Sequence, residues 1–412
     1  MKVCFETFGC RLNKAEALQM EAEYLAKGWE STDEHKEADL FVVRGCSVTA
    51  RAQRECERMI DHLRRRYPAV PIRVCGCLDY KSAKTPAAVQ AAMLKAPQAA
   101  SGGNVPVPMR TSRAYLKVQD GCSGACTFCI VPQFRGKSVS VPFSEVMDRA
   151  RRFVDAGYRE VVVTGCNLSL YASEGRRLPE LVSQLAAVGE ARIRLGSLEP
   201  GSCALETVHA MAENGSVCRF LHVSAQSGSN KILKAMRRPY DIRDVDLLVS
   251  TASKLVPDMG IGCDLMTGFP GESDLDFQAT KGLLKRLPFT NAHVFPYSER
   301  PGTLAAGFSG SVNAGIRSAR AHRLASLAAA KRESFAKKFI GRTVEIAVEG
   351  DRHCTGWTSE YLCCSAVGTA PRRSLVKIFV TKVHGDGSLE GRLLTKSPPG
   401  KKTIVTAGSS MV

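Results

Sequence analysis

Three cysteines in one short loop constrain this chain more than any other feature. Cys122, Cys126 and Cys129 have the spacing CxxxCxxC, with Ser-Gly-Ala between the first two. Three thiolates in a tight loop suit a 4Fe–4S cubane, in which three irons bind protein sulfur and the fourth iron stays open. Structural zinc is the alternative, and it needs a fourth ligand from elsewhere in the chain. Phe128, in the second gap, would cover one face of a cluster and favours the cubane.

Strand and helix patterns alternate six times around and after this loop. The predicted strands are Tyr115–Val118, Glu160–Thr164, Ile193–Leu198, Leu221–Ala225, Gly260–Met266 and Ala292–Pro296. Helical stretches between them include Ser144–Ala156, Leu205–Ala212, Asp241–Leu255 and Leu275–Leu287. Six βα units predict a partial (β/α)6 barrel, related to the eight-unit barrel, over residues 110–335.

Polar or glycine residues follow every one of these six strands. They are Cys122, Gly165 with Asn167, Glu199, Gln226 to Ser229, Gly268 to Gly271, and Tyr297 with Ser298. Chemistry in βα barrels gathers at the carboxyl ends of the strands. The sequence therefore predicts one functional site at that end of the barrel.

Residues 1–105 predict a separate small α/β domain. Strand patterns at Val3–Phe8, Leu40–Val43 and Ile72–Val74 alternate with helical stretches at Ala15–Lys27 and Ala50–Tyr67. This βαβ order predicts a parallel sheet. Residues 97–112 are rich in Pro, Gly and Ser and predict a linker.

A second set of cysteines belongs to this N-terminal sheet. Cys10, Cys46 and Cys77 each follow a predicted strand, and a glycine precedes each of them. Because the carboxyl ends of parallel strands meet at one edge, the three thiols could converge there and hold a second cluster. Three unrelated buried cysteines are the alternative. Cys75, two positions before Cys77, is a rival ligand that would more naturally be a packed thiol.

The last third predicts a long helix followed by a small antiparallel β-barrel over residues 339–396. The helix, Asn313–Lys338, precedes strand-like runs at Val344–Val348, His353–Trp357, Tyr361–Ser365, Leu375–Val383 and Leu389–Leu394, and the tail from Ser397 is expected to fray. Seven cations on the helix suit phosphate contact, although a solvated face explains them too. They are Arg317, Arg320, Arg323, Lys331, Arg332, Lys337 and Lys338.

Composition adds two constraints. The net charge of +17 favours a polyanionic partner, with nucleic acid as the first candidate and a generally basic proteome as the alternative. The 16 cysteines stand in a chain without an export signal or an apolar run long enough to span a membrane. We therefore expect a cytoplasmic protein whose clustered cysteines bind metal rather than form disulfides.

The order of motifs resembles the methylthiotransferase family of radical S-adenosylmethionine enzymes over nearly the whole chain. The motifs are GCRLN (9–13), the three-cysteine loop with IVPQFRG (130–136), HVSAQSGS (222–229), GFPGE (268–272) and HVFPYSERPGT (293–303). The resemblance implies two 4Fe–4S clusters and S-adenosyl-L-methionine. Cys122, Cys126 and Cys129 would hold the cluster that makes a radical, and Cys10, Cys46 and Cys77 an auxiliary cluster that supplies sulfur.

By the same resemblance, Thr164, Gly165 and Asn167 hold the amino group of the cofactor, and Glu199, Gln226 and Ser229 contact its other polar atoms. Turn or capping roles are the alternatives, above all for Ser229, which precedes a helix at Lys231–Met236. No catalytic side chain is assigned.

The family modifies an adenosine beside the tRNA anticodon or an aspartate of a ribosomal protein. Cys10-Arg11-Leu12-Asn13 and the run 195–200 (LGSLEP) look most like the branch that acts on carbon 2 of N6-threonylcarbamoyladenosine at position 37. The isopentenyladenosine branch typically has QMN after the first cysteine. The ribosomal-protein branch typically has PKN there and an acidic residue in place of Arg300. A non-catalytic RNA-binding zinc protein is the most distant alternative.

The resemblance further implies a C-terminal barrel of TRAM type that binds the anticodon stem-loop of tRNA. It also implies an electron donor such as flavodoxin or ferredoxin, and a monomer. Three departures from the family pattern bear on the site. Arg44-Gly45 replaces the usual Asn-Thr before Cys46, Leu78-Asp79 replaces the usual residues after Cys77, and Cys166 occupies a position that is normally aliphatic.

Overall fold

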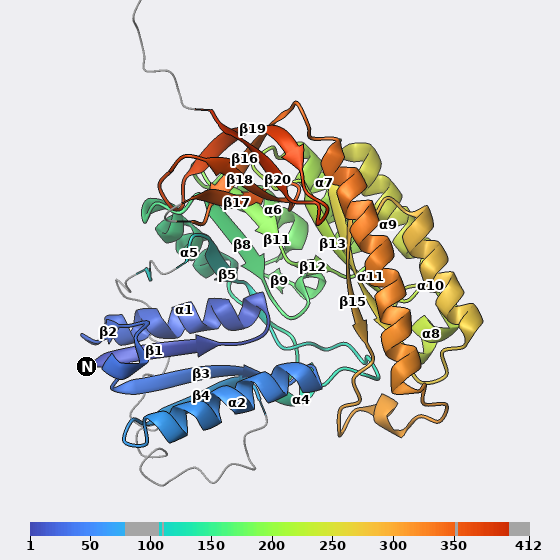
Figure 1. The fold of residues 1–412 in the computed structure, drawn as a ribbon, viewed down its shortest axis with the longest axis horizontal. Helices are drawn as coiled ribbons and strands as arrows, with labels where there is room; N and C mark the ends of the chain where they lie inside the picture. The colour runs from blue at the N-terminus through green and yellow to red at the C-terminus, as the bar shows by residue number, and fades with distance from the viewer. Residues whose placement is uncertain (79–106, 109–110, 351–352, 395–412) are drawn as a thin grey trace, which may run out of the picture.

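The computed structural model describes residues 1–78, 107–108, 111–350 and 353–394. Most of the linker predicted at 97–112, the domain ends predicted at residues 105 and 396, and the tail from Ser397 lie outside the described residues. Figure 1 shows the N-terminal sheet at one end of a central barrel and a small β-barrel at the other end. Among the described residues, no helix is long and apolar enough to cross a membrane.

The N-terminal sheet is parallel, as predicted, with the order β2-β1-β3-β4. Its strands are β1 (Lys2–Thr7), the unpredicted β2 (Glu30–Ser31), β3 (Leu40–Cys46) and β4 (Ile72–Cys77). Helix α1 (Arg11–Leu25) packs on one face through Ala17 and Tyr24, and α2 (Ala50–Arg66) packs Ile60 and Leu63 on the other face. Strands β3 and β4 run three residues beyond their predicted ends, because pairing continues from Arg44 with Cys75 to Cys46 with Cys77.

The central unit is the predicted partial barrel of parallel strands. Its strands are β5 (Ala114–Lys117), β8 (Glu160–Thr164), β11 (Arg192–Leu195), β12 (Ser197–Leu198), β13 (Phe220–Gln226), β14 (Gly260–Thr267) and β15 (Asn291–Pro296). The strand predicted at Ile193–Leu198 is interrupted at Gly196. A Cβ at Gly196 would lie 3.2 Å from Cδ1 of Leu168, so a larger residue would crowd the core.

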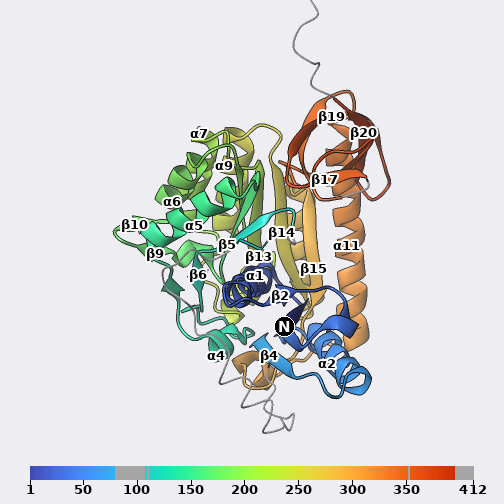
Figure 2. The ribbon, with the colours of Figure 1, turned by 90° about the vertical axis from the view of Figure 1, so that its left-hand side faces the viewer.

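Helices cover the outer face of the barrel and pack on its apolar side chains (Figure 2). They are α5 (Phe143–Asp155), α6 (Leu178–Ala186), α7 (Ser202–Glu213), α8 (Asn230–Ala235), α9 (Ile242–Leu255) and α10 (Asp274–Arg286). Shorter elements are α4 (Val131–Arg135), the pair β6 (Gln119–Asp120) and β7 (Val139–Ser140), the pair β9 (Ala172–Ser173) and β10 (Arg176–Arg177), and 3-10 turns at His35–Glu37, Leu168–Leu170 and Leu304–Gly307.

Helix α11 (Ala314–Lys337) runs along the side of the barrel toward the small C-terminal barrel (Figures 1 and 2). Five described strands close that barrel in the order β16-β17-β18-β20-β19. They are β16 (Thr343–Val348), β17 (Cys354–Thr358), β18 (Cys363–Val367), β19 (Leu375–Val383) and β20 (Leu389–Leu393). The predicted antiparallel barrel is confirmed, with one exception among its described strand pairs, since β18 and β20 are parallel. A closed ring with an odd number of strands cannot alternate direction all the way round.

The small barrel docks on the central barrel through a buried ionic cluster. The carboxylate of Glu160, which is fully buried, accepts from Nε of Arg192 at 2.6 Å and from Nε of Arg194 at 2.8 Å. Arg194 Nη2 also donates to the carbonyl of Thr358, at the end of β17, at 2.8 Å. Burial alone would raise the pKa of Glu160, but the guanidinium groups hold that pKa well below its usual range. The cluster therefore stays ionised and ties the two barrels together.

We predict that Glu160→Gln destabilises the protein by about 3–5 kcal/mol, because it leaves buried guanidinium groups without their counter-ion. Thermal denaturation followed by circular dichroism measures this as a lower melting temperature. Glu145→Gln is the matched control. Glu145 pairs with Arg149 on the surface of α5, so this change should stay within about 0.5 kcal/mol. Equal melting temperatures for the Glu160→Gln variant and the parent would contradict the prediction.

Candidate functional site

The structure brings Cys10, Cys46 and Cys77 together at the carboxyl edge of the N-terminal sheet. Cys46 and Cys77 end neighbouring strands and are paired in register. The segment with Cys10 packs directly on them, because a Cβ at Gly9 would lie 2.9 Å from Sγ of Cys46. Gly9 has φ +88°, a conformation that favours glycine at this close approach. The structure thus places the three cysteines at one edge of the sheet, and their role as metal ligands stays a prediction.

Burial and mutual proximity favour the protonated forms of Cys46 and Cys77. Burial, followed by the neighbouring thiols, raises the pKa of Cys46 to about 11, and burial raises the pKa of Cys77 against the opposing effect of Arg135. Cys10 is the N-cap of α1, where backbone N–H groups and the helix dipole favour negative charge. A metal cluster that displaces the protons would therefore find an electrostatically favourable position beside Cys10.

Cys75 does not share this edge. Its Sγ lies 3.4 Å from Nη1 of Arg44 and 4.0 Å from Sδ of Met20, and the side chain packs on the α1 side of the sheet core. Gly76, at φ +94°, follows it. Cys77, paired with Cys46, is thus the better placed of the two rival ligands.

The loop with Cys122, Cys126 and Cys129 is fixed at the carboxyl end of the barrel. The backbone N–H of Cys122 donates to Gly136, and Thr127 donates through its N–H to Met236 and through its hydroxyl to Ala235. Nη1 of Arg238 donates to Sγ of Cys126 at 3.0 Å. Burial, with the neighbouring thiols adding to it, raises the pKa of Cys129 to about 11. Phe128 turns toward Phe269, with ring centroids 6.4 Å apart.

Within the described residues, a further group of possible metal ligands is formed by Cys4, Glu6 and His35, whose ligand atoms all lie within 4.8 Å of one another. No disulfide uses the cysteines of the described chain.

Gly165 and Asn167 follow β8 and surround the side chain of Gln119. A Cβ at Gly165 would lie 2.8 Å from Oε1 of Gln119, so this position requires glycine. The backbone N–H of Asn167 donates to the same Oε1 at 2.9 Å, and Oδ1 of Asn167 accepts from the N–H of Ser169 at 3.1 Å. Thr164 is buried at the end of β8. The turn role is therefore confirmed for Asn167, and cofactor contact stays a prediction.

Gln226, Ser229 and Glu199 differ in what their side chains already bind. Oε1 of Gln226 is buried without a hydrogen-bond partner in the described part of the chain, and Gln226 has φ +61°. Ser229 caps α8, accepting from Ile232 N and donating to Asp276 at 2.7 Å, so the capping alternative is confirmed. Glu199 pairs with Nη2 of Arg238 at 2.6 Å. Gln226 therefore has the strongest geometric claim to an additional ligand.

Two arginines, which sequence reasoning did not assign to the site, contact the thiols directly. Nε of Arg135 donates to Sγ of Cys77 at 2.7 Å, as Arg238 does to Cys126. The motif IVPQFRG, which ends with Arg135 and Gly136, could have indicated Arg135 as a site residue. No motif in the sequence indicated Arg238. Cys166, the unusual residue after Gly165, lies with Sγ 3.7 Å from Oδ1 of Asp120.

Three of the seven cations predicted on the long helix form hydrogen bonds or ion pairs with described residues outside the helix. Arg320 is buried and pairs with Glu272 and Asp274, both at 2.6 Å. Arg317 donates to the carbonyls of Val312 and Tyr297, and Lys331 donates to the carbonyl of Leu287. Their charge is thus used to attach α11 to the barrel.

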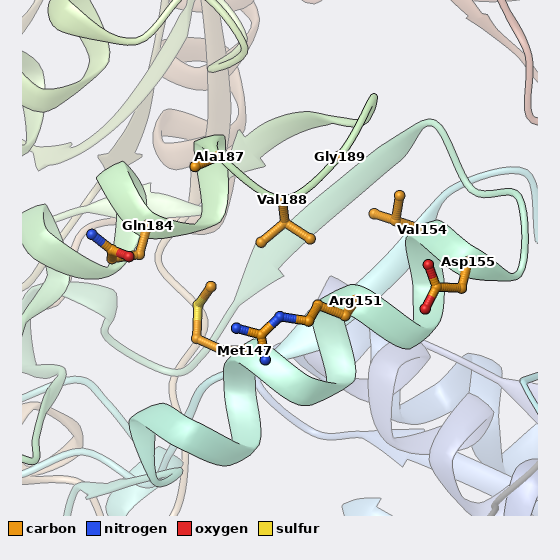
Figure 3. A pocket seen from close by; sticks show the side chains of 8 residues that line it. All are labelled: Met147, Arg151, Val154, Asp155, Gln184, Ala187, Val188 and Gly189. Atoms are coloured by element: carbon orange, nitrogen blue, oxygen red, sulfur yellow. The ribbon is translucent and has the colours of Figure 1, made fainter.

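A cavity of about 370 Å³ lies apart from the candidate site (Figure 3). It is on the outer side of the barrel, between α5 and the loop that follows α6, and none of the predicted site residues lines it. Its lining residues are Met147, Arg151, Val154, Asp155, Gln184, Ala187, Val188 and Gly189.

Two family models match parts of the chain. Residues 116–284 match the model of the radical SAM superfamily, and residues 2–93 match the uncharacterized protein family UPF0004. The computed fold is similar to a radical S-adenosylmethionine methyltransferase, TsrM, from Kitasatospora setae, with a TM-score of 0.53 and 13% identity over 74% of this chain and 76% of that one.

Curated relatives cover nearly the whole chain. The chain is 31% identical to the threonylcarbamoyladenosine tRNA methylthiotransferase MtaB of Chlamydia pneumoniae, over 92% of this chain and 95% of that protein. It is 32% identical to the MtaB protein of Thermotoga maritima (84% and 86%) and 32% identical to the tRNA-2-methylthio-N(6)-dimethylallyladenosine synthase of Zymomonas mobilis (84% and 85%). The chain belongs to the methylthiotransferase family of radical S-adenosylmethionine enzymes.

Proposed function

We propose that this enzyme adds a methylthio group to carbon 2 of N6-threonylcarbamoyladenosine at position 37 of tRNA. The observation that carries the proposal is the pair of cysteine trios, one at the carboxyl end of the barrel and one at the carboxyl edge of the N-terminal sheet, where Arg135 of the central domain donates to Cys77. The relatives named for this substrate, which match over 84–92% of the chain, support the choice of adenosine.

Each trio is proposed to hold one 4Fe–4S cluster. Bound at these sites, the clusters and S-adenosyl-L-methionine supply the radical and the sulfur that methylthio transfer needs. The protein orients and shields them. Arg135 and Arg238 donate to ligand sulfurs, while Gly165 keeps the turn after β8 tight against Gln119. Within the described structure, Gln226 offers an unpartnered buried oxygen to the cofactor. Thr164, Asn167, Glu199 and Ser229 are proposed as further contacts of the cofactor, as the family resemblance implies.

The basic surface supports a tRNA substrate. Helix α2 exposes Arg51, Arg54 and Arg58 in its first half and three consecutive arginines, 64–66, at its end. Such a surface attracts phosphate regardless of sequence and leaves base recognition to other contacts. We propose that it binds the anticodon stem-loop together with the small barrel. We further propose that the enzyme acts in the cytoplasm as a monomer and receives electrons from a flavodoxin or ferredoxin.

The second candidate substrate is N6-isopentenyladenosine in tRNA. The 32% identity to the Zymomonas mobilis enzyme named for the dimethylallyl nucleoside favours it specifically. The same transfer chemistry would serve both adenosines, so the two candidates differ in substrate recognition alone.

Mass spectrometry of tRNA nucleosides decides between them. We expect deletion of the gene to abolish 2-methylthio-N6-threonylcarbamoyladenosine and to leave the isopentenyl nucleoside unchanged, and the wild-type gene to restore the lost nucleoside. Loss of the 2-methylthio form of isopentenyladenosine would favour the second candidate. An unchanged nucleoside profile would reject both and direct attention to a ribosomal protein.

Removal of an auxiliary thiol should separate radical formation from sulfur transfer. After anaerobic reconstitution we expect about eight irons per chain for the parent and about four for Cys46→Ala. The variant should still release 5′-deoxyadenosine from S-adenosylmethionine but transfer no methylthio group. Cys75→Ala is the matched control, because Cys75 contacts Arg44 and Met20, and it should keep about eight irons. Equal iron content in both variants would reject Cys46 as a ligand.

Replacement of Gln226 should weaken cofactor binding. Its buried Oε1 has no partner within the described structure, so a donor on the cofactor would satisfy it. We expect Gln226→Leu to raise the Kd for S-adenosylmethionine roughly tenfold, equivalent to about 1.4 kcal/mol, measured by equilibrium dialysis on the reconstituted enzyme. Ser229→Ala should mainly lower stability, by about 1 kcal/mol, because it removes a helix cap. An unchanged Kd for Gln226→Leu would contradict the proposed contact.

A further inference from the structure

Arg135, six residues after Cys129 in the chain, contacts a cysteine of the other trio through its guanidinium group. It is the last residue of α4, the short helix that follows the loop of Cys122, Cys126 and Cys129, and α4 packs against β4. Nε of Arg135 donates to Sγ of Cys77 at 2.7 Å. The arginine belongs to the central barrel, whereas the sulfur belongs to the N-terminal sheet. The contact therefore crosses the interface between the two domains.

The remaining donors of Arg135 hold it in one orientation. Nη1 donates to Oε1 of Glu16 and to Oδ1 of Asp120, both at 2.9 Å. Nη2 donates to Oδ1 of Asn13 at 2.9 Å and to Oε2 of Glu16 at 3.0 Å. The side chain is only 8% exposed. A planar fork that uses all its N–H groups in this way cannot rotate away from Cys77 without losing buried hydrogen bonds.

The charges around Arg135 do not cancel. Glu16 pairs with Arg44, Lys117 and Arg135, and Asp120 pairs with Lys117 and Arg135. Three cations thus face two carboxylates, which leaves one positive charge in excess. Buried excess charge is costly, and the sulfur of Cys77 lies where a compensating anion would be placed.

The loop of Cys122, Cys126 and Cys129 has a similar contact between an arginine and a thiol, but there the charge of the arginine is balanced by a carboxylate. Arg238 donates to Cys126, but it also pairs with the carboxylate of Glu199 at 2.6 Å. The charge of Arg238 is therefore largely neutralised by its own counter-ion. In contrast, the ion pairs around Arg135 leave one positive charge without a counter-ion next to the cysteines of the N-terminal sheet.

We propose that Arg135 is a positioning residue that raises the reduction potential of the cluster at Cys10, Cys46 and Cys77 and fixes that cluster relative to the radical-forming loop. This inference rests on the proposed function, because it requires that cluster. Reduction adds one electron, and a cation that donates a hydrogen bond to a ligand sulfur stabilises the more negative state. Removal of the cation should make the auxiliary cluster harder to reduce.

The test is a redox titration of the auxiliary cluster alone. The full-length chain with Cys122, Cys126 and Cys129 replaced by alanine retains one trio, and electron paramagnetic resonance follows its reduction. We expect Arg135→Gln to lower the equilibrium constant for reduction at least tenfold, which is about 59 mV for one electron. Arg135→Lys, which keeps the charge without the fork, should show a smaller shift. Arg151→Gln removes the same charge from the surface of α5 and should show none.

A second variant, which should shift the reduction potential in the opposite direction, tests the inference even if Arg135→Gln does not fold. Asp120→Asn removes one carboxylate from the network, so the potential should shift toward more positive values. Wild-type potentials in Arg135→Gln and Asp120→Asn, each with about four irons, would overturn the inference. If the alanine background itself binds no iron, the auxiliary cluster is absent. That result would remove both this inference and the proposed source of sulfur.

Discussion

The ion pairs of the Glu16 carboxylate fix the position of the N-terminal sheet relative to the central barrel. Glu16 lies on α1 of the N-terminal domain and accepts from Lys117 on β5 at 2.6 Å and from Arg135 on α4, both in the central domain. It also pairs with Arg44 within its own sheet. A buried charge shared in this way cannot lose its partners without a cost of about 3–5 kcal/mol. The carboxyl ends of the two sheets, and with them the two cysteine trios, are therefore held face to face.

The sequence predicted the sheets because hydrophobic periodicity is a local property. Strands β8 and β19 have their predicted bounds, and the other barrel strands shift by one or two residues at an end, apart from the interruption at Gly196. Convergence of Cys10, Cys46 and Cys77 followed from topology alone, since parallel strands share a carboxyl edge. The ends of β3 and β4 were harder to predict. Glycine normally weakens a strand, yet Gly45 and Gly76 pair in register and carry the ladder on to the cysteines.

The partners of the charged residues could not be predicted from the sequence, because these ion pairs join positions far apart in the chain. Glu199 was expected at the cofactor, and its carboxylate pairs with Arg238, which in turn holds Cys126. The cationic stripe of α11 looked like a phosphate-binding face, but Arg320 is buried against Glu272. Arg44, a departure from the family pattern, contacts Glu16, Met20 and Cys75 rather than a cysteine of the auxiliary trio. That departure thus alters the packing behind the auxiliary site and leaves its edge intact.

The short motif GCRLN connects the auxiliary site to both other domains. Cys10 offers a thiol, and Asn13 holds the carbonyls of Phe8 and Gly45 around it. Arg11 lies between these two residues in the sequence. Its Nη1 donates to the carbonyl of Leu195 at 3.4 Å, and its Nη2 donates to the hydroxyl of Tyr361 at 2.9 Å.

Tyr361 in turn fastens the small barrel to the central one. Its ring stacks between Phe220 of the central barrel and Trp357 of the small barrel, with centroids 4.6 and 4.5 Å away. The stacking maintains φ +66° at Tyr361, which an isolated turn would rarely adopt. Because Arg11 is covalently next to Cys10, a displacement of the small barrel changes contacts one residue from an auxiliary thiol. The side chain of Arg11 therefore links the small barrel directly to the sheet edge that carries Cys10.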